Sequence, residues 1–374
     1  MLKVSVLGIG NAGNQVAALA AQKGFPAIAL NTSEKDLLTV KANVRTIVIG
    51  DERGVGKDRS EAKKFVKEYM GSLLETEKFI ELISDKDIVI VASSTGGGSG
   101  SGAAPVMCNV LQNFVPDTHF IPLGIAPTLE ESLAAQQNTV EYLTEQQKVN
   151  PSYLLYDNHA FHKEASHLIL EKINQKIIED LCVIRGDYQH LTPYNSIDEK
   201  DAMRILRTPG RIVIATATGF KEKDIADKSI EQLLIDDIKR GGHAELEFDR
   251  NIKRLGMIVN TTQKVYSTID NNITAIKEFV GEPIEGFEHI ALNDEVESRV
   301  SLIMAGLSFP EDRVSKIVER IDEIKENLNA SKKSTVLETV DIGGLRSLRQ
   351  ENNGQNDETK EKAFDMAALM ADYD

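Results

Sequence analysis

The sequence has few of the features that mark secreted, metal-binding and membrane-spanning proteins. Its 374 residues include two cysteines, Cys108 and Cys182, both in apolar stretches typical of helices. We expect buried thiols in a reducing compartment, and neither a disulfide framework nor a metal site. The seven histidines show no ligand spacing, and no apolar run is long enough to span a bilayer. No secretory leader is recognised, so we expect a cytoplasmic protein that does not insert into membranes.

Positive charge is also scarce. The chain has 43 lysines and arginines against 58 aspartates and glutamates, a formal net charge of −15. Binding to DNA depends mainly on clustered lysines and arginines that neutralise phosphates. No aromatic motif typical of RNA-binding modules is present. We therefore expect no direct nucleic acid binding, and a role on DNA would require a basic adaptor protein.

The most informative segment present is glycine-rich. Residues 95–102 read TGGGSGSG, between an apolar run typical of a strand, 88–93, and a helix-like stretch, 103–111. Glycine lets the backbone approach a ligand closely, and a helix N-terminus adds unpaired N–H donors for phosphate. A flexible Gly/Ser linker is the alternative, which the flanking strand and helix disfavour. The loops of P-loop ATPases and GTPases end in Gly-Lys followed by Ser or Thr. This loop has no lysine, so the P-loop class is disfavoured.

A second glycine turn occurs near the start of the chain. Residues 8–13, GIGNAG, follow a strand-like segment, 4–7, and precede a helix-like segment, 14–22. The spacing matches the dinucleotide-binding fingerprint, which also requires an acidic residue at the end of the second strand. Here that strand, 27–30, is followed by Asn31, Thr32 and Ser33. The missing carboxylate counts against a nicotinamide-dependent oxidoreductase, which stays open as an alternative.

Together the two glycine loops resemble the phosphate loops of the tubulin/FtsZ superfamily of GTPases. Residues 10–15, GNAGNQ, are similar to the first phosphate loop of the tubulins, and residues 96–105, GGGSGSGAAP, to the superfamily signature in its FtsZ form. The resemblance covers about residues 1–330 and implies that GTP or GDP binds with Mg²⁺. It assigns nucleotide contacts to Gly10, Asn11, Ala12, Gln15, Gly97, Gly98, Ser99, Gly100 and Ser101.

Three further positions are assigned to the nucleoside by the same resemblance. Residues 126–131, APTLEE, are similar to the loop whose glutamate binds the ribose hydroxyls, and the spacing from the proline indicates Glu131. A strand, 153–156, is followed by Asp157 and by Asn158, which stands where the family contacts guanine. Asn174 lies off the apolar stripe of a long helix expected at about 163–185, where the family places a second guanine contact. A solvated helix residue is the alternative for Asn174.

Two acidic residues, Asp198 and Asp201, define the expected catalytic loop, 195–201. Their spacing lets both face one side of a helix start. FtsZ-like proteins use such a loop to enter the nucleotide site of the next subunit, although Ser196 stands where FtsZ usually has asparagine. The alternative is a helix cap, in which Asp198 binds first-turn N–H groups and Asp201 favours the helix dipole.

The resemblance implies an α/β fold of the tubulin/FtsZ type. A doubly wound GTPase domain, 1–207, includes the central helix and the catalytic loop, and a smaller α/β domain follows over 208–308. A C-terminal helix is expected at 309–330, with an apolar stripe from Val314 to Leu328, and a flexible tail at 331–374. The end of the tail, 363–374, is apolar and acidic. It is either a partner motif or a frayed terminus.

Details of the C-terminal region are most similar to the TubZ group, which plasmids and phages encode. The long last helix is absent from FtsZ, and residues 313–321 and 332–337 also resemble that group. This implies a bacterial cytoplasmic GTPase whose head-to-tail filaments hydrolyse GTP on subunit contact and segregate plasmid or phage DNA, with a TubR-type adaptor bound through the tail. The alternatives are a division or phage-positioning filament, and a scaffold that binds nucleotide without turnover.

Overall fold

The computed structural model describes residues 1–149, 152–190, 192, 194–221, 229–244, 252–269, 280–293 and 297–334. The partner motif expected at 363–374 lies outside these residues, as does the expected tail beyond 334. Within the described chain, no helix has the length and apolarity needed to cross a membrane. Cys108 and Cys182 are buried free thiols, as predicted.

The strands form one continuous hydrogen-bonded sheet in the order β3-β2-β1-β4-β5-β6-β7-β10-β8-β9. The first seven strands in this order pair in parallel, and β10 pairs antiparallel with both β7 and β8. The mixed α/β class predicted from the sequence is therefore confirmed. The strands are β1 (Val4–Ile9), β2 (Ala27–Asn31), β3 (Arg45–Val48), β4 (Ile88–Ser94), β5 (His119–Ala126), β6 (Ser152–Asp157), β7 (Gly210–Thr218), β8 (Arg254–Thr261), β9 (Glu285–Leu292) and β10 (Arg299–Leu307).

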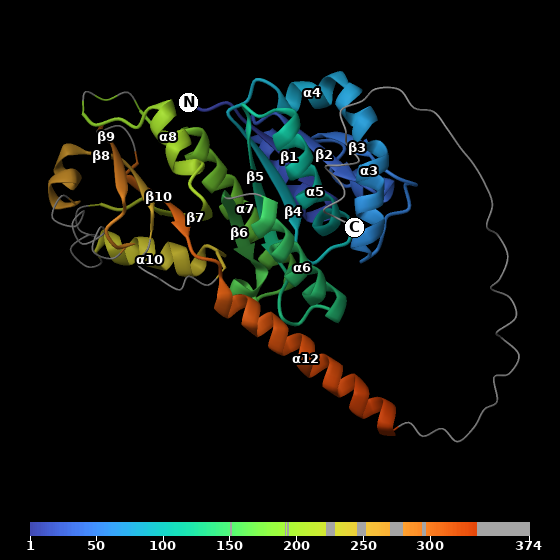
Figure 1. Ribbon diagram of the computed structural model, residues 1–374. Coiled ribbons are helices and arrows are strands. Elements are labelled where there is room, and N and C mark those ends of the chain that lie inside the picture. The colour runs from blue at the N-terminus through green and yellow to red at the C-terminus, as the bar shows by residue number, and fades with distance from the viewer. Residues whose placement is uncertain are drawn as a thin grey trace, which may run out of the picture.

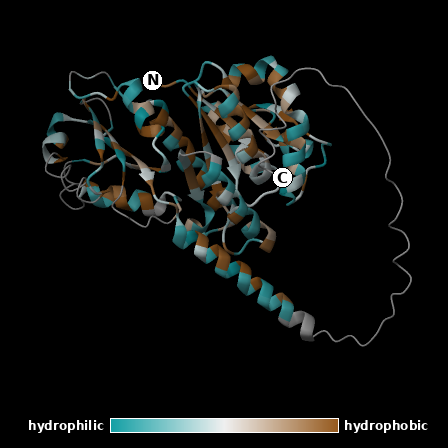
Figure 2. Cartoon of the chain, in the orientation of Figure 1, coloured by the Kyte–Doolittle hydropathy of each residue, from teal (hydrophilic) through white to brown (hydrophobic). Residues whose placement is uncertain are grey.

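Helices cover both faces of the parallel half, because successive side chains of each buried strand point to opposite faces. One face packs against α1 (Gly10–Gln22), α2 (Glu34–Leu38) and α7 (Ser166–Arg185). The other packs against α3 (Arg59–Glu75), α4 (Glu77–Ile83), α5 (Ser99–Phe114) and α6 (Leu133–Val149). Figure 2 shows hydrophobic residues gathered on the strands and the inner helix faces. The remaining elements are η1 (Asn158–Phe161), α8 (Glu199–Leu206), α10 (Ile230–Arg240) and α12 (Glu311–Ser334).

The central helix α7 begins after β6 and η1, at the carboxyl ends of the strands, and ends beside Leu2, ahead of β1. Its stripe, Ile169, Ile173, Ile177 and Leu181, is buried as the spacing predicted. The helix ends at Gly186, whose φ of 89° suits the left-handed C-terminal position. At that end the carbonyl of Arg185 accepts a hydrogen bond from the N–H of Leu2, two residues before β1. At 1.5 Å per residue, α7 is about 30 Å long.

The last helix, α12, follows β10 and packs against α6. Its apolar stripe is buried only in the first half, where Ile317 and Ile321 are 0% and 8% exposed, whereas Leu328 is 50% exposed. Figure 1 shows the second half extending away from the body of the molecule. The expected packing of this stripe is therefore confined to the first turns of the helix.

A buried ionic cluster joins α7 to β6, β7 and α10. The ammonium of Lys176 binds the carboxylates of Asp180 and Asp237 at 2.9 and 2.8 Å. Asp180 also accepts the Tyr156 hydroxyl at 2.7 Å and lies 3.4 Å from the His243 ring nitrogen. Burial alone would raise the pKa of Asp180, but the charge of Lys176 and hydrogen bonds from the His243 ring and the Tyr156 hydroxyl hold that pKa below its usual range. The carboxylate of Asp180 is therefore ionised because the Lys176 ammonium and hydrogen-bond donors surround it.

Removing Lys176 should destabilise the fold strongly. In Lys176→Met, a fully buried Asp180 loses its counter-ion, so we expect the free energy of unfolding to fall by about 3–5 kcal/mol. The measurement is urea unfolding of nucleotide-free monomer, with Lys172→Met as control. Lys172 lies on the same helix and is about half exposed in its pair with Glu164, so its loss should cost less than about 1 kcal/mol.

The pH dependence of the free energy of unfolding tests the same cluster, because Asp180 is the carboxylate that Lys176 stabilises. The folded pKa of Asp180 lies below its unfolded value, which is about 3.9. Its stabilising contribution is thus complete above that pH and is lost as the pH falls through the folded pKa. Equal losses in the Lys176→Met and Lys172→Met variants would contradict this account of the cluster.

Candidate functional site

The two glycine loops meet at the carboxyl edge of the sheet, because β1 and β4 are adjacent and parallel. A Cβ on Gly10 would lie 2.9 Å from the nitrogen of Gly100, and a Cβ on Gly100 would lie 2.8 Å from the carbonyl oxygen of Ile9. Gly10 also has a φ of +72°, which side chains rarely adopt. Glycine is therefore required for the loops to touch.

Both loops are the first turns of helices. We expected the helices to begin at 14 and 103, but α1 begins at Gly10 and α5 at Ser99. The glycines were assigned to connecting loops because of their low helix propensity, and tertiary contacts override it. Neither helix has a side-chain N-cap hydrogen bond or an acidic residue in its first turn. Two helix N-termini with unpaired N–H donors therefore converge on one place.

A third loop, which contains Gly56 and Lys57, supports the second glycine loop from the side. A Cβ on Gly98 would lie 2.4 Å from the carbonyl oxygen of Gly56. The side-chain amide of Asn138, on α6, donates to the carbonyls of Lys57 and Gly97, both at 3.0 Å, and of Gly96 at 3.4 Å. One buried amide thus ties α6, the third loop and the second glycine loop together.

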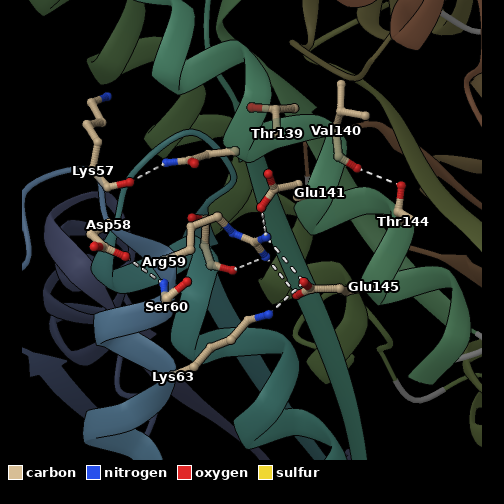
Figure 3. Close-up of polar contacts among 12 residues, drawn as sticks. Lys57, Asp58, Arg59, Ser60, Lys63, Thr139, Val140, Glu141, Thr144 and Glu145 are labelled. Carbon is tan, nitrogen blue, oxygen red and sulfur yellow. Dashed lines mark hydrogen bonds and ion pairs between the residues drawn. The ribbon is translucent and has the colours of Figure 1, made fainter. Parts of the chain in front are cut away.

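Arg59, at the start of α3, braces the same loop (Figure 3). Its side chain is 4% exposed and binds Glu141 and Glu145 of α6, each at 2.7 Å. It also donates to the carbonyl oxygen of Ser101 at 2.9 Å, and Lys63 binds Glu145 at 2.8 Å. The sequence analysis missed Arg59 and Asn138, because their partners lie about 40 to 86 residues away along the chain.

The two predicted loop hydroxyls are both engaged within the protein. Ser99 Oγ lies 2.7 Å from Oγ1 of Thr32, the residue directly after β2. Ser101 Oγ donates to the carbonyl oxygen of Gly97. Asn31 Oδ1 accepts the N–H of Thr32 at 2.8 Å. The residues that replace the dinucleotide-type carboxylate therefore support the glycine loop.

The remaining first-loop residues lie on α1. Asn11 is exposed, Ala12 is half-buried, and the amide of half-buried Gln15 reaches Thr39 Oγ1 at 3.5 Å. Asn14, which was not predicted, is completely buried. Neither side-chain polar atom of Asn14 has a hydrogen-bond partner among the described residues.

The predicted nucleoside residues are not all brought together. Glu131 is exposed in the segment after β5, and half-buried Asn158 follows β6, so both lie at the carboxyl edge. Asn174 lines a cavity of ≈ 440 Å³ with Gln22 and Lys23, at the opposite end of α1 from the glycine loop. Its guanine contact stays a prediction that this position does not support.

The acidic pair lies at the other edge of the sheet. Asp198 lines a cavity of ≈ 310 Å³ with Met1 and Leu2, which precede β1. Its carboxylate accepts the N–H of Asp201 at 2.8 Å, so Asp198 is the N-cap of α8. The helix-cap alternative is therefore confirmed as a structural role. Within one chain, Asp198 and Asp201 lie far from the glycine loops.

Comparison with known proteins identifies the family. Residues 3–166 match the Tubulin/FtsZ family, GTPase domain. This part of the chain is similar to the GTPase domain of the tubulin/FtsZ family. Members of that family are GTPases that bind GTP and GDP.

Relatives in two groups are similar over most of the chain. CetZ of Thermococcus kodakarensis is 26% identical over 261 residues, 67% of each protein. TubZ of Clostridium botulinum C phage is 24% identical over 321 residues, 83% of this chain and 80% of the relative.

Solved structures from both groups share the fold. A GTPγS-form protofilament of Bacillus thuringiensis TubZ has a TM-score of 0.74 at 17% identity and covers 89% of this chain and 94% of that one. A GTPγS-bound protofilament of Haloferax volcanii CetZ has a TM-score of 0.72 at 19% identity, covering 87% and 100%.

Substitutions at two adjacent glycines should differ in their effect on stability. In Gly98→Ala the methyl group would meet the backbone of Gly56, whereas the nearest atom to a Cβ on Gly97 is 3.9 Å away. We expect Gly98→Ala to lower the free energy of unfolding by about 1–3 kcal/mol. The matched Gly97→Ala should stay within about 0.5 kcal/mol of the wild type. Urea unfolding without nucleotide measures both, and equal effects would contradict the loop packing.

Proposed function

We propose that the chain binds GTP with Mg²⁺ at the carboxyl edge of the sheet and hydrolyses it to GDP and phosphate within head-to-tail filaments. The observation that carries the proposal is the convergence of the uncapped N-termini of α1 and α5, an arrangement that favours a phosphate chain. In this proposal the phosphates contact Gly10, Asn11, Ala12, Gln15, Gly97, Gly98, Ser99, Gly100 and Ser101. The ribose binds Glu131 and guanine binds Asn158, whereas the position of Asn174 beside Gln22 and Lys23 does not favour the guanine contact predicted for it.

Gly97 gives independent support for this assignment. Gly96, Gly98, Gly100 and Gly102 each have a neighbouring atom within 3.1 Å of a built Cβ. The nearest such atom to Gly97 is 3.9 Å away, so the fold itself does not require glycine there. Open space beside backbone at the end of two helices is where a phosphate group would approach.

Mg²⁺ fits this site as a partner of the nucleotide. Among the described residues, no cluster of three or more histidine, cysteine, aspartate or glutamate side chains could hold a metal ion. Mg²⁺ commonly binds phosphate oxygens and water with few protein ligands. It would neutralise charge on the transferred phosphoryl group. The protein contributes the N–H groups and hydroxyls that orient the phosphates.

The position of the acidic pair supports a shared active site. Asp198 and Asp201 occupy the amino edge of the sheet and the glycine loops the carboxyl edge, with strands of roughly 20 Å between them. Stacking of subunits along the strand direction would bring the carboxylates of one onto the nucleotide of the next. There they would orient water for attack on the γ-phosphate. The protofilaments of the TubZ and CetZ structures are consistent with such stacking.

The filament is proposed to segregate plasmid or phage DNA in a bacterial cytoplasm. Similarity to the phage TubZ over 83% of the chain supports this role. The net charge of −15 favours attachment through a basic, TubR-type adaptor, bound by the C-terminal tail. The similarity to CetZ, which is equally close, favours a second candidate, a tubulin-like filament with a role other than DNA segregation. Retention of a plasmid that carries the gene and its neighbours distinguishes the two.

Asp198→Asn should separate catalysis from folding. Asparagine caps helices as well as aspartate does, so α8 keeps its N-cap while the carboxylate is lost. We expect GTP-dependent pelleting to persist and phosphate release per pelleted subunit to fall by about 100-fold or more. The control is Glu199→Gln, which removes an exposed carboxylate one residue further on and should change turnover little. If the Asp198→Asn variant released phosphate at the wild-type rate, the catalytic role of Asp198 would be refuted. If the wild-type protein did not bind GTP, the nucleotide site itself would be refuted.

A further inference from the structure

The segment after β5, residues 127–131, is held by hydrogen bonds along its backbone. Gln136 of α6 donates to the carbonyl oxygen of Thr128 at 2.7 Å. The N–H of Leu129 donates to Nδ1 of His159 at 3.4 Å. Burial and the charge of Arg313 lower the pKa of His159, which favours the neutral ring that can accept this bond. The segment thus has a fixed path although its carboxylates are exposed.

Two of its anchors come from α12, which is more than 180 residues away in the chain. Arg313 Nη2 donates to the carbonyl oxygen of Pro127 at 2.8 Å, and Arg320 Nε donates to that of Leu129 at 3.2 Å. The two arginines are seven residues apart, two helical turns, so they lie on the same side of the helix. The helix therefore grips alternate carbonyls of the segment that ends in Glu131.

Arg313 also fixes the end of the neighbouring strand. Its guanidinium is 2% exposed and binds both carboxylate oxygens of Asp157, itself 3% exposed. Such a bidentate pair has a defined geometry, and a buried ion pair tolerates loss of one partner poorly. Asp157 accepts the N–H of His159 at 2.9 Å and directly precedes Asn158. One arginine thus sets the positions of both segments that would face the nucleoside.

We infer that Arg313 and Arg320 are positioning residues through which α12 sets the ribose side of the nucleotide site. The inference rests on the proposed function, since it takes Glu131 as the group that binds the ribose hydroxyls. Neither arginine touches the nucleotide in this account. They hold backbone carbonyls, so that the carboxylate of Glu131 is presented at one place. A displacement of α12 would therefore change sugar recognition before phosphate binding.

Arg320 is the residue to test, because its side chain is 35% exposed and its loss should leave the fold intact. Arg313 is buried in its ion pair, and its removal would disturb folding. The variants of the full chain are Arg320→Ala, Arg320→Lys and Glu323→Ala. Glu323→Ala is the matched control, because it removes the exposed Arg320–Glu323 pair and keeps the bond to Leu129.

Calorimetric titration below the assembly concentration compares GDP with 2′-deoxy-GDP. The wild type should prefer GDP, and Arg320→Ala should reduce that preference by about three- to tenfold, with little change in 2′-deoxy-GDP affinity. Arg320→Lys, which still offers a cationic donor, should restore most of the preference, and Glu323→Ala should match the wild type.

An unchanged preference in Arg320→Ala, or an equal loss of affinity for both nucleotides, would overturn the inference and leave the proposed function standing. A wild type that binds GDP without ribose preference would do the same. A wild type that binds neither guanine nucleotide would instead refute the proposed function itself, and the inference with it.

Discussion

The structure depends on the parallel pairing of β1 with β4, which puts two glycine-rich helix N-termini side by side. The contact is possible only because Gly10 and Gly100 lack side chains, since a Cβ on either would come within 2.9 Å of the other loop. Helix ends without caps leave N–H groups and partial positive charge at one place. The fold thereby creates an anion site from backbone alone, and surrounding side chains serve to hold that backbone still.

The supporting side chains form a layer around the loops. Asn138 on α6 and Arg59 at the start of α3 both donate hydrogen bonds to carbonyls of the second glycine loop. Arg313 and Arg320 bind carbonyls of the segment that carries Glu131. These four contacts to the loops go to main-chain oxygens and leave the N–H groups at the helix N-termini available. Such preorganisation suits phosphoryl transfer, in which the protein mainly positions groups and stabilises charge.

The sequence was sufficient for features with a local signal. Glycine spacing located both loops, apolar periodicity located α7, and the spacing of Asp198 and Asp201 indicated a helix start that the structure contains. Helix starts at Gly10 and Ser99 were missed, because glycine predicts a loop unless tertiary contacts outweigh propensity. The pairs Arg59–Glu145 and Arg313–Asp157 join residues 86 and 156 positions apart. No periodicity or motif in one sequence encodes such contacts, and the same is true of the cavity beside Asn174.

The central claim is that the nucleotide site becomes catalytic only when a second subunit supplies its acidic loop. The most direct measurement is phosphate release per subunit and pelleting, followed together across protein concentrations with GTP, GDP, ATP and NAD. The account predicts pelleting that depends on GTP, and turnover that stays near zero below a critical concentration and rises above it. Turnover per subunit that is independent of concentration, or no assembly with GTP, would contradict it.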